Sequence, residues 1–338
     1  MFWGKVELKS TTINSSTRLN SFWRRIRVGV LALPVEEATL SRRGFRGATE
    51  EMRVRLELIG AEFLRGYRAA LAHAKPPTLS VALDAGEREG RGFAYEGAAM
   101  GLALRDALTP WRANRVAEFL RGAGDAHVYM VHVGVGWVWA RVPFGRRRAA
   151  RRLDPLLRWL AFDGWGFHEG FFHWPKYVTG ESWPRQLDAN ERRVFDQGLG
   201  RSFWFVNGGN PELIASTINS LPAARHADLW SGIGLAATYA GIVDETALQS
   251  LQKSAGPHRP QLAQGAAFAA KARQRAGNLT AYTGLATGVL CAMSAPDAAR
   301  LCDTTLEDLP ANAGPTAFET WRRRIQIHFQ SKSTLPEA

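Results

Sequence analysis

The chain has 338 residues, of which 46% are hydrophobic, and a formal net charge of +12 that comes mostly from arginine. This hydrophobic content supports a packed core and excludes a chain that is disordered throughout. The two cysteines, Cys291 and Cys302, lie on apolar helical segments and lack metal-ligand spacing. We expect no structural disulfide framework, and a reducing compartment fits.

The N-terminal part is polar. Residues 1–20 are rich in Ser, Thr and Asn without hydrophobic periodicity, which predicts a flexible leader. The basic, aromatic segment 22–28 could dock on the core or touch a membrane interface. The apolar run 28–34 is too short for a membrane span, and we expect neither a signal peptide nor a transmembrane helix. We predict one helical-repeat domain over residues 21–330 and a tail over residues 331–338.

A long helix is predicted from Thr49, a favourable N-cap, to about His73. Its apolar residues recur every three or four positions, as in an amphipathic helix: Met52, Leu56, Ile59, Phe63 and Tyr67. The stretch 80–92 is polar and turn-rich, and further helices are predicted over 93–103, 110–122 and 127–141. Five valines lie in the last of these, so a strand remains an alternative there.

A basic connector follows, with arginine at five of the seven positions 146–152. It indicates either a solvated helix face or a contact with an anionic partner. Residues 154 and 155, Asp-Pro, begin a helix over 156–162, and residues 175–190 form a loop that could act as a lid. Later helices are predicted over 210–221, 225–240, 244–256, 260–276, 278–293, 294–306 and 318–329. The last carries arginines on its solvent side: Arg322, Arg323 and Arg324.

One pattern recurs through the chain: a glycine preceded by a polar or bulky residue and followed by small and apolar ones. It stands at intervals of 28 to 37 residues, at Gly66, Gly97, Gly134, Gly170, Gly198, Gly232 and Gly265. Such a period is typical of stacked helical hairpins, because one hairpin cannot bury its own apolar face. We predict an all-α fold of stacked hairpins, either an α-solenoid or a closed α/α ring, without the tetratricopeptide signature. The small residues of 229–241 indicate a helix that another helix approaches closely.

Polar side chains stand just before these glycines, and equivalent positions of stacked repeats line one surface. They are Glu96, His132, His168, Glu169, Asp196, Gln197, Ser231 and Gln264. Either they converge on a ligand groove, or they bond to neighbouring helices and hold the stack together. For a groove, the acid–base candidates are Glu96, His132, His168 and Glu169. The substrate-binding candidates, whose aromatics could equally be ordinary core, are Trp137, Phe172, Gln197, Arg201, Trp204, Trp230, Ser231, Gln264 and Phe268.

No metal or cofactor site is predicted. His168 and His173 are five positions apart, so on a helix they point to different faces, unlike the paired histidines of a zinc-binding helix. The glycine patterns lack the preceding strand and the lysine of nucleotide-binding loops. Neither a nucleophile elbow nor the setting of a catalytic cysteine is present. The arginines lack interleaved aromatics, so no nucleic-acid partner is expected.

Several long strings resemble a bacterial family, the domain-of-unknown-function 1702 family, and within it the UnbL-like enediyne biosynthesis proteins. They are GFAYEGAAM at 92–100, YMVHVGVGW at 129–137, DPLLRW at 154–159, DGWGFHEGF at 163–171, FDQGLGRS at 195–202, LWSGIGLAATYAG at 229–241 and PQLAQGAAFAAKAR at 260–273. The resemblance covers about residues 21–330. It implies a pathway that includes an iterative polyketide synthase, a UnbU-like membrane protein and a UnbV-like repeat protein.

On this resemblance we expect a maturation factor or enzyme of enediyne or polyene polyketide biosynthesis that binds an extended apolar intermediate in a helical groove. The alternative is a non-catalytic solenoid adaptor that docks partner proteins at the cytoplasmic membrane face, with the basic connector towards the membrane. Both place the protein in the cytoplasm, or peripherally at the inner membrane. The resemblance supplies no catalytic residue, so whether the protein is an enzyme stays open.

Overall fold

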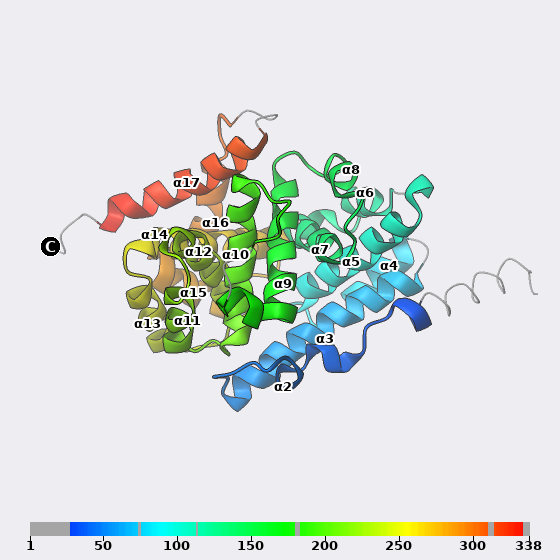
Figure 1. Ribbon diagram of the computed structural model, residues 1–338. Helices are drawn as coiled ribbons and strands as arrows, with labels where there is room; N and C mark the ends of the chain where they lie inside the picture. The colour runs from blue at the N-terminus through cyan, green and yellow to red at the C-terminus, as the bar shows by residue number, and fades with distance from the viewer. Residues whose placement is uncertain (1–27, 74–75, 113, 180–182, 310–313, 334–338) are drawn as a thin grey trace, which may run out of the picture.

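A computed structural model describes residues 28–73, 76–112, 114–179, 183–309 and 314–333. The leader predicted at 1–20 lies outside the described residues, as do residues 334–338 of the predicted tail. Every regular element within the described part is helical, which confirms the all-α prediction (Figure 1). No helix among the described residues is both long and apolar enough to span a bilayer.

The helices differ widely in length. The α-helices are α2 (Leu40–Arg43), α3 (Glu50–Ala72), α4 (Pro76–Asp84), α5 (Arg91–Leu108), α6 (Arg115–Leu120), α7 (Val128–Arg141), α8 (Arg146–Ala150), α9 (Leu160–Thr179), α10 (Ala189–Val206), α11 (Pro211–Asn219), α12 (Ala223–Ala240), α13 (Glu245–Ala255), α14 (Arg259–Arg275), α15 (Ala281–Cys291), α16 (Ala295–Thr304) and α17 (Gly314–Ser333). Short 3-10 helices are η1 (Val35–Ala38), η2 (Pro110–Arg112), η3 (Asp125–His127), η4 (Leu157–Trp159) and η5 (Gly256–His258).

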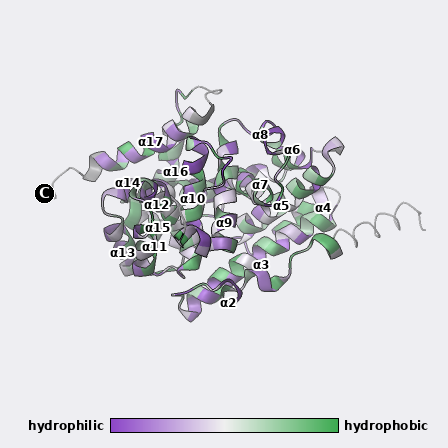
Figure 2. Ribbon diagram, viewed as in Figure 1, coloured by the Kyte–Doolittle hydropathy of each residue, from purple (hydrophilic) through white to green (hydrophobic). Residues whose placement is uncertain are grey.

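Seven long helices form an inner row in chain order: α3, α5, α7, α9, α10, α12 and α14. Figure 1 shows α9 and α10 side by side in the middle of the molecule, with α3, α5 and α7 on one side and α12 and α14 on the other. Shorter helices cover this row, and α11, α13 and α15 pack on one another as a second layer of the C-terminal half. Hydrophilic and hydrophobic residues alternate along α3, as the amphipathic pattern predicts (Figure 2).

Glycines set the spacing of the inner row. A Cβ atom at Gly198 of α10 would overlap the backbone carbonyl of Asp163 in α9, and one at Gly166 would overlap the carbonyl of Phe195. The two backbones therefore touch directly, and any side chain at these glycines would force the helices apart. Such reciprocal pairs join five neighbouring helix pairs: Gly66 and Gly97, Gly136 and Gly164, Gly166 and Gly198, Gly200 and Gly232, and Gly234 and Gly265.

Four inner helices carry two such glycines two positions apart, as in Gly134-x-Gly136 and Gly232-x-Gly234. Positions two apart are separated by about 200° around a helix, so one glycine faces the preceding helix and the other faces the following one. The close approach predicted for residues 229–241 is confirmed on both sides of α12. Gly170 differs from the other recurring glycines, because it packs on the side chain of Ser202 and not on a backbone.

The row curls until its end meets its beginning. Arg273 of α14 donates to the carbonyl of Glu89, which precedes α5, over 3.4 Å. Arg55 of α3 donates to the carbonyl of Ala240 at the end of α12 over 3.5 Å. The rings of Phe93 and Tyr239 pack edge to face with centroids 5.2 Å apart. Of the two predicted arrangements, these contacts favour the closed α/α ring.

Several predicted elements need correction. The stretch 80–92 is not all turns, because α4 occupies part of it; residues 76–84 carry the buried leucines Leu79 and Leu83. The valine-rich segment of α7, by contrast, is a helix as predicted, and the strand alternative is wrong. Arg322 was predicted on the solvent side of the last helix, which is wrong: it is fully buried and pairs with Asp228 of α12 at 2.7 Å.

Candidate functional site

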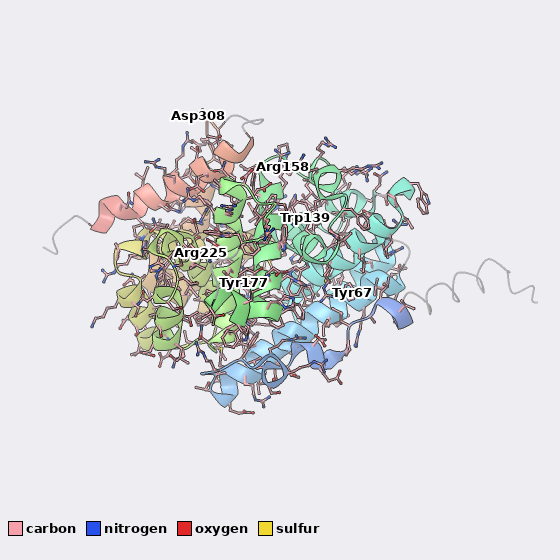
Figure 3. All side chains as sticks on the ribbon, viewed as in Figure 1. Tyr67, Trp139, Arg158, Tyr177, Arg225 and Asp308 are labelled. Atoms are coloured by element: carbon pink, nitrogen blue, oxygen red, sulfur yellow. The ribbon has the colours of Figure 1, made fainter. Side chains whose placement is uncertain are left out.

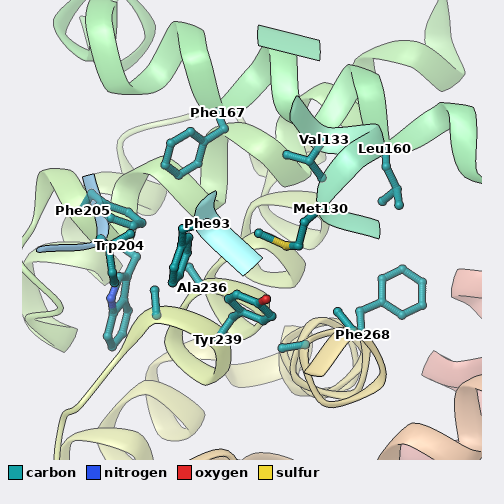
Figure 4. Packing of buried hydrophobic residues seen from close by; sticks show 14 of the residues in the cluster. Phe93, Met130, Val133, Leu160, Phe167, Trp204, Phe205, Ala236, Tyr239 and Phe268 are labelled. Carbon is teal, nitrogen blue, oxygen red and sulfur yellow. The ribbon is translucent and has the colours of Figure 1, made fainter. Parts of the chain in front are cut away.

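The inner helices enclose a small cavity of about 60 Å³. Its walls are aromatic and aliphatic, and Figure 4 shows Phe93, Phe167 and Tyr239, from three different helices, converging on it. Charged side chains also line the cavity: Glu37 of η1, Glu96 of α5 and Arg201 of α10. An apolar cavity with few polar groups is typical of a site that binds an apolar ligand in a fixed orientation.

Glu96, on α5, is a titratable side chain that lines this cavity. Its side chain is only 2% exposed, and its Oε1 accepts a hydrogen bond from Nε1 of Trp137 at 3.0 Å. Burial raises the pKa of Glu96 to about 7, although the charge of Arg201 and the Trp137 hydrogen bond both oppose the rise. A carboxyl with this pKa can both take up and release a proton near neutral pH, which general acid–base chemistry requires.

Arg201 of α10 faces the same cavity. It forms a buried ion pair with Asp163 of α9, and its guanidinium lies 4.9 Å from the ring centroid of Phe167. Burial acts to lower the pKa of Arg201, but the charges of Asp163 and Glu96 raise it overall. Its Nε has no hydrogen-bond partner among the described residues, so one buried N–H remains available to a ligand oxygen.

A second cavity, of about 30 Å³, lies next to the first and shares Arg201, Leu235 and Tyr239 with it. Phe268 lines this second cavity and packs on Trp321 with centroids 4.5 Å apart. Arg201 and Tyr239 therefore form part of the wall between the two cavities. A ligand in either one can contact the same guanidinium.

The polar residues before the repeat glycines form a hydrogen-bonded ladder across the inner row. Gln197 donates to Asp163 at 2.8 Å, and the hydroxyl of Ser231 lies 3.1 Å from Oε1 of Gln197 and 2.9 Å from Oε1 of Gln264. Gln326 of α17 donates to the same oxygen of Gln264 at 3.1 Å. None of Gln197, Ser231 and Gln264 lines the central cavity, and all three are fully buried. Their contacts hold neighbouring helices together.

His168 and Glu169 lie behind the cavity wall. Nε2 of His168 accepts a hydrogen bond from Nε of Arg141 at 2.9 Å, which assigns the ring proton to Nδ1, 3.5 Å from Oε1 of Glu169. Tyr177 (Figure 3) donates to the other oxygen of Glu169 at 2.7 Å. Burial lowers the pKa of His168, so the ring is neutral at neutral pH. Burial acts to raise the pKa of Glu169, but its hydrogen bonds to His168 and Tyr177 lower the pKa overall.

The structure does not gather the four predicted acid–base residues in one place. Of the four, only Glu96 lines the central cavity. His132 is fully buried, and its Nδ1 donates to the carbonyl of Val128 in its own helix at 2.7 Å, while Nε2 has no partner among the described residues.

Among the predicted substrate-binding residues, Trp137, Phe172 and Arg201 line the central cavity. Phe172 lies between two guanidinium groups, with Arg43 and Arg141 at 4.3 Å and 5.1 Å from its ring centroid. Trp204 and Trp230 are buried in the packed core and line neither cavity.

Asp163 is the site residue that the sequence reasoning missed. It precedes Gly164, and Gly164-x-Gly166 is the glycine pair of α9 that corresponds to Gly198-x-Gly200 of α10. The recurring pattern takes Gly170 as the glycine of α9, so the polar residues that precede it in the sequence are His168 and Glu169 and not Asp163. The doubled glycine was the signal in the sequence that could have found Asp163.

The residues show no arrangement for a metal. No group of three or more His, Cys, Asp and Glu side chains is placed to hold an ion anywhere in the described part of the chain. His168 and His173 have ring centroids 6.3 Å apart.

Residues 22–329 match the family model described as protein of unknown function (DUF1702). The chain belongs to this family. The match covers the whole inner row, both cavities and the ladder, so the glycine pairs and Glu96 all lie within the family domain. Comparison with curated proteins and with solved structures finds no significant match.

Proposed function

We propose that the protein is a maturation enzyme or maturation factor of an enediyne or polyene polyketide, and that it holds an extended apolar intermediate in the central cavity. The observation that carries the proposal is Glu96, a buried carboxyl with a pKa of about 7 in an aromatic cavity. The pathway rests on the resemblance of the sequence to UnbL-like proteins. The class of ligand rests on the aromatic lining and on the small number of polar groups.

The chemistry that this pair of residues favours is proton transfer next to a carbonyl group. The carboxylate of Glu96 would take a proton from a carbon adjacent to, or conjugated with, a ligand carbonyl. The free N–H of Arg201 would donate to the oxygen that becomes negatively charged. Return of the proton from Glu96 to another carbon moves a double bond along the chain, and this step needs no oxidant or reductant. A low-dielectric cavity strengthens both interactions.

The test is native mass spectrometry of the protein purified from cells with and without the neighbouring polyketide synthase. We expect an added mass of polyene size only when the synthase is present. In the variant E96Q the same added mass should persist, since the cavity keeps its shape. The ligand released from E96Q should be the unconverted isomer, which has the same mass as the product and is separated from it by chromatography and ultraviolet absorption. E169Q is the matched control, because Glu169 lies behind the wall and does not line the cavity. Equal conversion by E96Q and wild type would refute the role of Glu96.

The non-catalytic adaptor stays a prediction that the same experiment addresses. Retention of a partner protein together with a clean protein mass, with and without the synthase, would favour the adaptor over ligand binding. A second readout separates the two: an adaptor tolerates E96Q without loss of product in the producing cells, whereas an enzyme does not.

A further inference from the structure

A second apolar groove, of about 190 Å³, shares no lining residue with the central cavity and is independent of the proposed function. It lies between α5, α6, α7 and α8, and aliphatic side chains dominate its floor, including Val135, Val138 and Leu153. Phe144, which forms part of its wall, is 67% exposed, and Trp111, next to the lining residue Pro110, is 77% exposed.

One rim of the groove is strongly basic. Arg146, Arg148 and Arg152 line it from α8 and the turn that follows. The guanidinium of Arg146 packs on the ring of Trp165, 4.4 Å from the ring centroid. Arg148 is exposed, and among the described residues no carboxylate lies within ion-pair distance of it. Residues 141–160 contain seven arginines and one acidic residue, Asp154, which accepts hydrogen bonds from the backbone of Leu156 and Leu157.

The acidic residue on the other side of the groove does not cancel this rim. Asp106 lines the groove but forms an ion pair with Arg115 at 2.9 Å and accepts two backbone N–H groups. The groove therefore presents an apolar floor, one neutralised carboxylate and one rim of positive charge.

One residue that lines the groove has a buried donor without a partner among the described residues. Trp139 (Figure 3) lines the groove and is 4% exposed, yet its indole Nε1–H finds no acceptor among the described residues. Buried donors of this kind are normally satisfied, so a ligand oxygen is a natural partner. A membrane surface would cover Phe144 and Trp111 but would leave both the groove and this donor unfilled.

We infer that this groove binds a single-chain anionic amphiphile, with its alkyl tail on the floor, its charged head against Arg148, and an oxygen in reach of Trp139. The ligand class follows from the apolar lining, the rim charge and the unpartnered indole together. A long-chain carboxylate has all three complementary features.

The experiment is isothermal titration of the full chain with dodecanoate, far below its micelle concentration. Dodecyltrimethylammonium, which has the same tail and the opposite charge, is the matched ligand. We expect dodecanoate to bind and the cation to bind at least about tenfold more weakly, because a charge-assisted hydrogen bond replaces a like-charge contact. No binding of dodecanoate, or equal binding of both ligands, overturns the inference.

Variants locate the site. R148E should weaken dodecanoate binding about tenfold or more, whereas R147E, the same charge change on an exposed neighbour that does not line the groove, should change it less than about twofold. A107F fills the groove from α5 and should abolish binding while the circular dichroism spectrum stays unchanged. Binding that R148E and A107F leave intact places the ligand elsewhere, such as the central cavity, and overturns the inference.

Vesicles separate this ligand from a membrane. We expect the protein to extract a fluorescent long-chain carboxylate from phosphatidylglycerol vesicles without sedimenting with them. Co-sedimentation that R147E and R148E reduce equally would show a diffuse electrostatic membrane contact instead, and would overturn the assignment of the groove.

Discussion

Replacing Glu96 by glutamine should change how the stability of the protein depends on pH. Glutamine keeps the acceptor for Trp137 and stays neutral at every pH, whereas the buried carboxyl must ionise as the pH rises. The ordinary pKa is 4.5 and the pKa in the folded protein is about 7, a difference worth about 3 kcal/mol at about 1.4 kcal/mol per pH unit.

The sign follows from linkage. Because the folded protein holds this proton more tightly than the unfolded chain, the stability from the neutral carboxyl is complete below a pH of about 4.5. It is lost as the pH rises to about 7. Between about pH 5 and about pH 8.5 the loss amounts to about 2.5 kcal/mol. For a chain of 338 residues this corresponds to about 3–4 °C in Tm.

The assay is thermal unfolding of wild type and E96Q across this pH range. We expect the Tm of E96Q relative to wild type to rise by about 3–4 °C from about pH 5 to about pH 8.5. Taking the difference between the two proteins cancels other buried groups, such as Asp196, whose pKa burial raises to about 6. A difference that stays constant with pH would refute a neutral Glu96 and, with it, the acid–base role.

Four further substitutions test the contacts between the helices. G232A should destabilise the protein by more than about 3 kcal/mol, because its Cβ would overlap the backbone of α10. G288A lies on an exposed turn of α15 with open space around it and should stabilise the protein by up to about 1 kcal/mol. Urea unfolding measures the free energy of unfolding of both variants. D228N should cost about 1–3 kcal/mol, since the buried guanidinium of Arg322 loses one of its two carboxylate partners and keeps Glu319 at 3.0 Å. S231A should cost about 1–3 kcal/mol by removing the donor that bridges two amide oxygens. Equal midpoints for G232A and G288A, or a D228N or S231A midpoint matching wild type, would show that these contacts do not stabilise the ring.

The sequence predicted those parts of the fold that depend on local pattern. Thr49 caps α3, with its hydroxyl accepting from the backbone N–H of Met52 at 3.2 Å, and the five residues of the predicted apolar face are buried. The recurring glycines predicted helix for α7 against the strand propensity of its valines, because close helix crossing requires glycine whatever the neighbouring residues favour.

Features that depend on distant partners were not predictable in this way. Arg322 was placed on the solvent side because neighbouring arginines normally face water, but its partner Asp228 lies 94 positions earlier in the chain. Closure of the ring depends on single contacts between its ends, such as Arg55 with the carbonyl of Ala240, which leave no periodic trace. Glu96 and Arg201 are both predicted as site residues from the sequence, whereas the ion pair of Arg201 with Asp163 depends on the three-dimensional packing.

The glycine crossings have a consequence for how such a protein can diversify. Where two helices touch backbone to backbone, their separation is set by main-chain atoms and not by side-chain volume. The side chains that face the central cavity then do not determine the distance between the helices. Residues such as Leu235 and Ala236 can change in size without altering the diameter of the ring. One rigid frame could thus be fitted to ligands of different length and width by substitution of its inner surface alone.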